Sequence, residues 1–288
     1  MKERPILFSG PMVKAILEDR KGATRRVRNL EPVNSNPNEW KLKCLGKMKL
    51  GKNGEKRGPF SAFFESQTGD FKYTEECSCP WGEPGDRIWA RETWRPIGWN
   101  EGEPIYIEYQ DGKKKECDPC AALPGTDYES WEERIIEQAC EECEKAGCET
   151  TPGGSYFWEG KCPIKWRPSI HMPRWASRIL LEIADIRVER LQDITDEDAK
   201  SEGVFFKDYG RMCFHKGSVR PVGDCTAPEN THPKYNGWSW KETSGPGECL
   251  GSARFGFANL WNHVNGVNAW EANPWVWVVE FKRVEIKP

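Results

Sequence analysis

The sequence has no apolar stretch that approaches the ~20 residues needed to span a bilayer, and its first residues lack the hydrophobic segment of a signal peptide. It also lacks an excess of charge, since 42 Lys and Arg stand against 45 Asp and Glu, a net charge of −3. This balance excludes a uniformly basic nucleic-acid coat, although not a local basic patch. No internal repeat is found. We therefore expect a soluble, cytoplasmic protein with no membrane partner.

Tryptophan and cysteine are both abundant, with 15 and 12 copies among 288 residues. Hydrophobic residues make up 37% of the chain, which is enough to form a core. The cysteines are about 4% of the residues, well below the ~8–10% of a small secreted disulfide scaffold. In a reducing compartment, clustered cysteines indicate metal ligands before they indicate disulfides.

Strongly patterned segments alternate with loose polar ones. Helices are expected to be few and short, and the strands are separated by loops. This pattern predicts an α+β fold, a small β-barrel with one or two packed helices and long insertions. Gly22 is expected to end the first helix in a left-handed turn. The predicted elements are a strand at 5–8, a helix from Pro11, a strand at 88–93, a helix at 130–145, a strand at 178–191, a helix from Thr195 to Gly203 and a central strand at 275–284.

Five of these segments, in this order, resemble the ASCH-domain family in the long form common in bacteriophages and prophages. The segments read PILFSGPMVKAIL with RKGATRR, CPWGEPGDRIWARETW, WRPSIHMPRWASRILLEI, LQDITDEDAKSEGV and NPWVWVVEFKRV. The resemblance implies a single PUA-like β-barrel domain over residues 1–288. Its core covers about residues 1–31, 77–97, 166–206 and 253–288, and the insertions are 32–76, 98–165 and 207–252.

The family signature near the first helix is glycine-x-lysine, then threonine or glutamate, then x-arginine. It maps to Asp19, Lys21, Thr24 and Arg26, and Asp19 departs from the usual glycine. Small members of the family hydrolyse N4-acetylcytidine with a lysine, a threonine and a glutamate. The resemblance therefore implies Lys21, Thr24 and Glu202 as candidate catalytic residues.

The residue types suit such chemistry. A threonine hydroxyl is a weak nucleophile and needs a base, which a lysine can supply if its pKa is lowered. Arg25 and Arg26 stand close to Lys21 in the sequence and act in that direction. The alternative is that Lys21 to Arg26 is a solvated helix terminus, where cations suit the helix dipole.

A second polar group lies at Arg91 and Glu92, which with Arg25 and Arg26 are our candidate ligand-binding residues. Glu92 could compete with Glu202 as the key acid, because a strand would present it to the cleft. The alternative is that Glu92 forms an ion pair with one of the arginines at 25–28.

Four cysteines in the 98–165 insertion have the spacing of a zinc site. Cys117 and Cys120 form one Cys-x2-Cys pair, and Cys140 and Cys143 form a second one 19 residues further on. Zinc would be structural, because four thiolates leave no open position and metal binding would supply folding free energy to a polar segment. Cys148 or Cys162 could replace a member of either pair. The alternative is a set of reduced, unliganded thiols.

The resemblance implies a protein that recognises a modified nucleobase or nucleoside, alone or in RNA or DNA. The cysteine spacing adds structural zinc, and no organic cofactor is expected. Amidohydrolysis of N4-acylcytidine is the enzymatic version of this function. The alternatives are a non-catalytic nucleic-acid-binding module and a phage accessory or assembly protein. Tryptophans in or beside glycine-rich loops are candidates for stacking on bases, namely Trp238, Trp240, Trp261 and Trp270.

Overall fold

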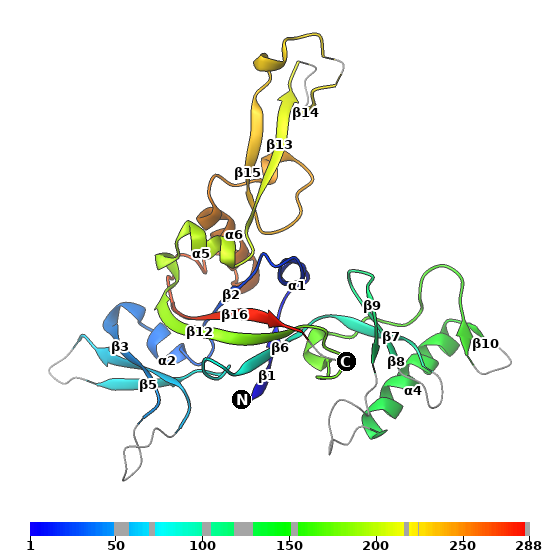
Figure 1. The fold of residues 1–288 in the computed structure, drawn as a ribbon, viewed down its shortest axis with the longest axis horizontal. Helices are drawn as coiled ribbons and strands as arrows, with labels where there is room; N and C mark the ends of the chain where they lie inside the picture. Colours follow the sequence, from blue (N-terminus) through cyan, green and yellow to red (C-terminus); the bar gives the residue numbers. More distant parts are fainter. Residues whose placement is uncertain are drawn as a thin grey trace. The chain divides into compact units, whose positions relative to one another are not determined.

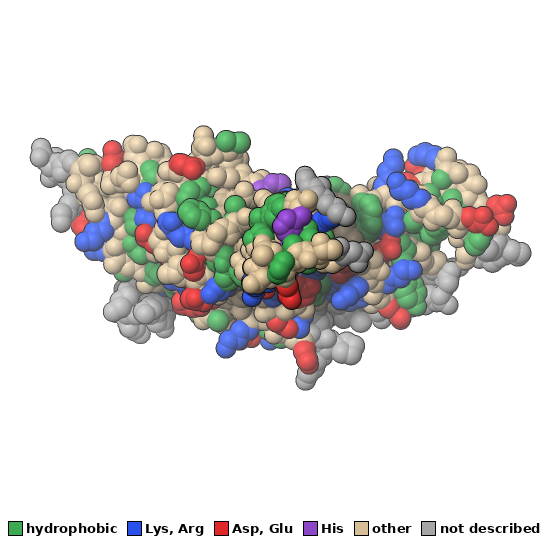
Figure 2. Space-filling model, turned by 90° about the horizontal axis from the view of Figure 1, so that it is seen from above, with side chains coloured by type: hydrophobic (Ala, Val, Ile, Leu, Met, Phe, Trp, Pro, Cys, Tyr) green, Lys and Arg blue, Asp and Glu red, His purple; other side chains and the backbone are tan. Residues whose placement is uncertain are grey.

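The computed structural model describes residues 1–48, 58–68, 73–99, 105–117, 129–150, 155–215, 219–223 and 225–285, with only the backbone for 129–132. The fold is mixed α+β, with many strands and few helices, as predicted. Within the described ranges no sheet closes into a barrel. None of the helices described is long and apolar enough to cross a membrane. Cationic and anionic side chains are interspersed over the face seen in Figure 2.

Contacts between Cα atoms divide the chain into two compact units, and each is described by itself. Unit 1 contains Met1–Val13, Arg87–Leu181 and Arg283–Pro288. Unit 2 contains Lys14–Asp86 and Glu182–Lys282.

In unit 1 the strand β1 lies beside β6, and in unit 2 the strands β12, β16 and β2 lie side by side in this order (Figure 1). β1 pairs in parallel with β6, and β16 pairs antiparallel with β2. The last strand of the chain, β16, lies between two others and is buried along most of its length, which confirms its predicted central position. The bounds are Glu3–Leu7 for β1, Arg87–Arg91 for β6, Leu180–Arg190 for β12, Trp275–Val284 for β16 and Ala23–Arg26 for β2.

The strand predicted at 178–191 is present as β12, and its buried face changes within it. Leu181 and Ile183 are buried, Ala184 and Asp185 are both exposed, and Ile186 and Val188 are buried again. Two consecutive exposed residues are what a change of phase in a strand requires.

Unit 1 is built on an antiparallel three-stranded sheet and one long helix. The sheet contains β7 (Trp94–Gly98), β8 (Ile105–Tyr109) and β9 (Lys114–Cys117). The helix α4 (Glu129–Lys145) confirms the helix predicted at 130–145. The other elements of this unit are β10 (Glu149–Thr150), β11 (Tyr156–Phe157) and the 3₁₀ helix η2 (Ser169–His171).

Unit 2 contains two further antiparallel sheets that the sequence reading did not resolve. The first, in place of at most one hairpin expected between 29 and 76, contains β3 (Trp40–Gly46), β4 (Ser61–Ser66) and β5 (Thr74–Ser78). Before it come α2 (Glu31–Asn34) and η1 (Pro37–Glu39).

The second sheet lies mostly within 207–252, one of the insertions that the resemblance implies. β13 (Phe205–Cys213) lies between β14 (Arg220–Pro221) and β15 (Lys234–Ser239). Figure 1 shows β13 and β15 side by side, with β14 at the far end and α6 (Ala253–Asn265) at the base. We call residues 205–239 the β13–β15 lobe. The 3₁₀ helices η4 (Glu229–Thr231) and η5 (Pro246–Glu248) lie within and after it.

Two short helices precede the residues of the candidate site, Lys21 after the first and Glu202 after the second. α1 (Gly10–Leu17) begins at the predicted proline, and α5 (Asp196–Ser201) follows η3 (Leu191–Asp193). Thr195 caps α5 in a capping box with Asp198. Gly203 follows with a φ of 99°, as the prediction requires. The turn after α1 differs from the prediction, because Asp19 adopts the left-handed conformation, with a φ of 55°, and Gly22 does not.

Candidate functional site

Lys21 and Glu202 are joined through backbone and side chain alike. The chain turns after α1, where the amide of Lys21 donates to the carbonyl of Ala15 (3.1 Å). The next amide, of Gly22, donates to the carbonyl of Ser201 at the end of α5 (2.8 Å). This places Lys21 opposite Glu202 in an antiparallel bridge. Two segments far apart in the sequence therefore present their polar side chains to each other.

The side chains of this pair are fully buried. Lys21 Nζ donates to Glu202 Oε2 (2.6 Å) and to the Glu202 carbonyl (2.9 Å), and the two side chains are 0% and 2% exposed. Burial lowers the pKa of Lys21, and the Glu202 carboxylate opposes this effect. Arg26 and Arg25 add to the lowering. The arginines therefore act in the predicted direction, but burial is the larger cause.

Arg25 connects the pair to a wider network. From β2, its Nη1 lies 3.3 Å from Glu202 Oε1, and its Nη2 lies 2.6 Å from Glu189 Oε1. The side chain of Arg25 is 0% exposed, so its charge is compensated inside the protein rather than offered to solvent. Burial also lowers the pKa of Arg26, against the effect of Glu202.

Thr24 precedes Arg25 on β2 and is buried, with 1% of its surface exposed. It lies opposite Val279 of β16. Hydrogen bonds join Lys21 and Arg25 to Glu202, and the strand carries Thr24 next to this group.

Glu92 belongs to a different ion pair from the one considered in the sequence. In unit 1, Arg178 Nε and Nη2 donate to the two carboxylate oxygens of Glu92 (2.9 and 2.7 Å). Burial raises the pKa of Glu92, and Arg178 opposes it. The partner is therefore Arg178 and not an arginine of 25–28. The neighbouring Arg91 places its guanidinium 4.9 Å from the ring centre of Trp89.

Two cysteines of the predicted zinc site, Cys117 and Cys143, lie in different clusters. Cys117 packs with Trp94 and Ile105, whereas Cys143 packs with Ala139 and Ile164. Burial raises the pKa of Cys117 to about 11 and that of Cys143 to about 12. Cys148 and Cys162, the possible replacements, border the second cluster, where Cys140 also contributes to the pKa of Cys143. Cys120 lies outside the described residues.

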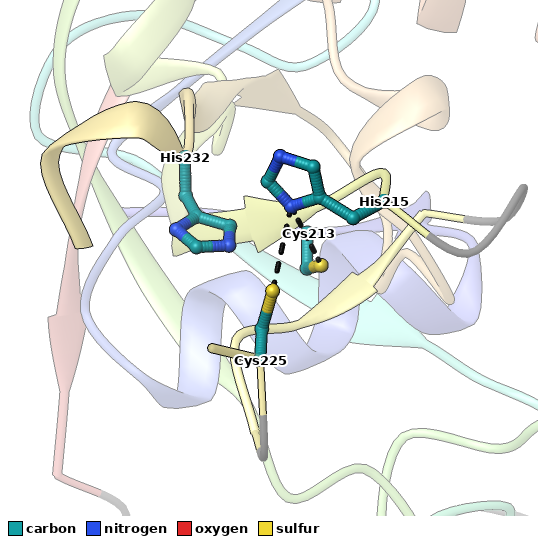
Figure 3. A group of neighbouring side chains, drawn as sticks. All are labelled: Cys213, His215, Cys225 and His232. Carbon is teal, nitrogen blue, oxygen red and sulfur yellow. Dashed lines mark hydrogen bonds between the residues drawn. The ribbon is translucent and has the colours of Figure 1, made fainter. Parts of the chain in front are cut away.

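A metal-ligating cluster is present in the β13–β15 lobe instead. Cys213, His215, Cys225 and His232 each offer one ligand atom, and these atoms all lie within 4.8 Å of one another (Figure 3). In the part of the chain that the structure describes, this is the one such group of at least three histidine, cysteine or acidic side chains.

The lobe itself brings the four ligands together. Cys213 ends β13, and His215 follows in the turn. Cys225 comes after β14, and His232 follows directly after η4. Antiparallel pairing of β13 with β14 and with β15 returns the chain to the same end of the lobe (Figure 1). Cys213 and His232 are buried, and His215 is exposed.

The distances match the edges of a metal-centred tetrahedron. His215 Nδ1 lies 3.5 Å from Cys213 Sγ and 3.4 Å from Cys225 Sγ. A tetrahedral zinc ion, with Zn–S near 2.3 Å and Zn–N near 2.0 Å, places sulfur and nitrogen ligands about 3.5 Å apart. The side chains therefore have the spacing of zinc ligands.

His232 has the orientation of a metal-binding imidazole. Its Nδ1 lies 3.1 Å from the carbonyl oxygen of Pro228, which makes this nitrogen the proton donor. The Nε2 atom is buried and has no hydrogen-bond partner. A histidine ligand commonly donates its second ring nitrogen to a carbonyl, which fixes the tautomer and leaves the other nitrogen for the metal.

Cys213 has an electrostatic environment that suits a thiolate. The pKa of Cys213 is lowered to about 6, chiefly by a hydrogen bond from the backbone of His215 and against the effect of burial. The thiolate is the form of cysteine that binds metals.

Sequence reasoning missed this cluster. The signal was present, because two of the four histidines in the chain alternate with two cysteines in the pattern Cys-x-His-x9-Cys-x6-His. The prediction for two of the tryptophans is also wrong, since Trp240 and Trp261 are 9% and 6% exposed and are not available for stacking on bases.

Comparison with protein-family models, curated proteins and solved structures finds no match.

Proposed function

We propose that the chain is an ASCH-type protein that recognises a modified nucleobase or nucleoside, free or within RNA or DNA, at a site built on Lys21, Thr24 and Glu202. The observation that carries the proposal is the buried contact between Lys21 and Glu202, which are 181 residues apart. The resemblance implies that both residues belong to one catalytic set. A PUA-like core is part of the same proposal.

The conformation of Asp19 also supports the resemblance. The family has glycine at this position, and Asp19 adopts a φ of 55°. Left-handed backbone is the region that glycine enters freely, and aspartate is one of the few other residues that tolerate it. The departure from the signature therefore keeps the backbone geometry that glycine would provide.

The enzymatic form of the proposal is hydrolysis of an N4-acylcytidine amide. Thr24 Oγ1 attacks the amide carbonyl and its proton passes to Lys21 Nζ, so Lys21 must first be neutral. Burial favours the neutral amine, because it lowers the pKa of Lys21. The C–N bond then breaks, and the proton moves from Lys21 to the cytidine nitrogen. Water hydrolyses the acyl-threonine to a carboxylic acid and restores the hydroxyl.

The test is deacetylation of N4-acetylcytidine by the full chain, with Thr24→Val and Thr24→Ser as a matched pair. Thr24→Val removes the hydroxyl at nearly constant volume, so it should abolish turnover, whereas Thr24→Ser should retain part of it. Circular dichroism checks that both variants fold. Absence of turnover by the natural chain, or full turnover by Thr24→Val or Lys21→Ala, would rule out this mechanism.

The alternatives remain a non-catalytic nucleic-acid-binding module and a phage accessory or assembly protein. Binding to RNA or DNA that weakens steeply with salt would favour the first. The position of Arg25 bears on this test, because its buried side chain is paired with Glu189 and Glu202. Substitution of Arg25 would disturb the fold, so Arg26 is the better residue to neutralise.

We also propose that Cys213, His215, Cys225 and His232 bind one structural zinc ion. Two sulfur and two nitrogen ligands are a typical zinc set, and four protein ligands leave no open coordination position for a substrate. Among the described residues at this end of the lobe, few apolar side chains are buried, so binding of the metal would contribute folding free energy. The zinc predicted in the 98–165 insertion is a separate hypothesis.

Elemental analysis of protein purified without added metal tests the zinc proposal. We expect at least one zinc per chain, and replacement of Cys225 by serine should remove one equivalent. Zinc far below one equivalent in the natural chain would refute it. Unchanged zinc in Cys225→Ser would assign the metal to other ligands.

A further inference from the structure

A cavity in unit 1 has the composition of an anion site. Its volume is about 500 Å³, and its polar lining includes Arg91, Arg134, Arg167 and His171. No aspartate or glutamate is among the described residues that line it. Ligand pockets have volumes of roughly 300–1,000 Å³, so the cavity can hold a small organic molecule.

Two of the arginines are held in place by protein contacts. Arg91 Nη1 donates to the carbonyl oxygen of Ile170 (3.0 Å). Arg167 Nη1 and Nη2 donate to the two carboxylate oxygens of Glu142 (2.8 and 3.2 Å). The Arg167 charge is thereby compensated, whereas the partner of Arg91 is an uncharged carbonyl group.

The same two arginines each retain a donor without a partner. The Nε atoms of Arg91 and Arg167 are buried and have no hydrogen-bond acceptor. A buried polar group left without a hydrogen bond costs about 1–3 kcal/mol, so such groups are normally satisfied by protein, water or ligand. Both residues line the cavity, so an anion there would meet guanidinium groups that the protein satisfies only in part.

Apart from Gln138, the rest of the lining is apolar. Trp94 and Met172 are each 1% exposed, and Ile135 is 8% exposed. Ile170 and Pro173 complete this wall. Inorganic phosphate has no apolar surface to pack against this wall, whereas a flat ring would bury apolar surface against it.

We propose that this cavity binds a small organic anion that carries a planar ring, with its charged group on the arginines and its ring against Trp94, Met172 and Ile135. A nucleoside monophosphate has this chemistry and this size. The residues differ from those of the Lys21 group, so the inference does not rest on the function proposed above.

Calorimetric titration of the full chain tests the proposal with three probes: cytidine 5′-monophosphate, cytidine and inorganic phosphate. The monophosphate should bind at least about tenfold more tightly than either fragment, because only it uses both the arginines and the apolar wall. Arg134→Gln removes an exposed guanidinium at the cavity. It should weaken binding of the monophosphate by about tenfold or more.

Two control variants make the result specific. Lys113→Gln removes an exposed cation of unit 1 that does not line the cavity, and it should leave the affinity unchanged. Thr24→Val should also bind the monophosphate normally, whereas loss of binding in that variant would assign the ligand to the Lys21 group. Equal affinities for the monophosphate and a fragment, or unchanged affinity in Arg134→Gln, would overturn the proposal.

Discussion

Lys21 and Glu202 form an ion pair of 2.6 Å between side chains that are almost wholly removed from solvent. Removal of two charges from water is costly, and a buried ion pair repays this cost only with close geometry and additional hydrogen bonds. Both are present here, since Lys21 also donates to the Glu202 carbonyl and Arg25 contacts the other carboxylate oxygen. The pair therefore fixes the turn after α1 against the end of α5.

Loss of the Glu202 charge should destabilise the protein strongly. Glu202→Gln leaves the buried ammonium group of Lys21 without its carboxylate, and breaking a buried pair in this way costs about 3–5 kcal/mol. Unfolding in urea measures the change. Glu242→Gln is the matched control, because Glu242 pairs with Lys14 on the surface, where such a pair contributes about 0–1 kcal/mol. Equal effects of the two substitutions would contradict the assignment.

The capping box of α5 should contribute to stability through one hydroxyl group. The Thr195 side chain accepts a hydrogen bond from the amide of Asp198 (3.1 Å). Thr195→Ala should lower the free energy of unfolding by about 1 kcal/mol, and Thr195→Ser, which keeps the acceptor, should restore most of it. If serine and alanine have the same effect on thermal unfolding, the hydroxyl is not the cap.

Asp198 should make the protein less stable in acid. Burial acts to raise the pKa of Asp198, but hydrogen bonds from Thr195 and the charges of Arg25 and Arg187 outweigh it and hold the pKa below 3.8. A carboxylate with a lowered folded-state pKa stabilises the protein fully above its ordinary pKa, and this contribution is lost as the pH falls below it. Between about pH 5 and pH 2, the natural chain should therefore lose more stability than Asp198→Asn. If urea unfolding shows the same loss of unfolding free energy with falling pH in both proteins, the prediction is contradicted.

Local sequence patterns predicted most of the elements that frame the site. Pro11, the acidic first turn of α5 and the alternation in β12 each act within a few residues, so they are legible without tertiary structure. The prediction of a left-handed turn at Gly22 is wrong, because Asp19 has this conformation instead. Glycine preference alone does not show which residue the backbone hydrogen bonds hold. Gly22 is instead held by hydrogen bonds to Ser201 and Phe281.

The metal-ligating cluster was less visible because its ligands are brought together by strand pairing. Cys213 and His215 flank the end of β13, but Cys225 and His232 reach them only through the return of the chain past β14. Glycine and proline in this region resembled a loop. The predicted Cys-x2-Cys spacing was a stronger signal in the sequence, yet Cys117 and Cys143 pack in different clusters.

Close packing at Gly237 should limit substitution in the β13–β15 lobe. A Cβ atom there would lie 2.7 Å from Cys249 Cβ and 2.8 Å from the carbonyl oxygen of Leu250. Leu250 forms an antiparallel bridge with Trp238, the residue after Gly237. The backbone at Leu250 therefore cannot move away from Gly237 without loss of these hydrogen bonds. Gly237→Ala should lower the free energy of unfolding by about 1–3 kcal/mol, as measured by thermal unfolding. Gly247→Ala, where the added atom meets nothing within 4 Å, should have little effect.

Removal of the metal should destabilise the lobe in particular. If Cys213, His215, Cys225 and His232 hold zinc, a strong chelator should lower the thermal midpoint and increase amide hydrogen exchange in residues 205–239, because bound metal stabilises only the folded state. Cys225→Ser should reproduce both changes and make the protein insensitive to the chelator. Cys44→Ser replaces an exposed thiol on β3 and should behave like the natural chain. Chelator sensitivity that persists in Cys225→Ser, with exchange unchanged in the lobe, would locate the stabilising metal elsewhere.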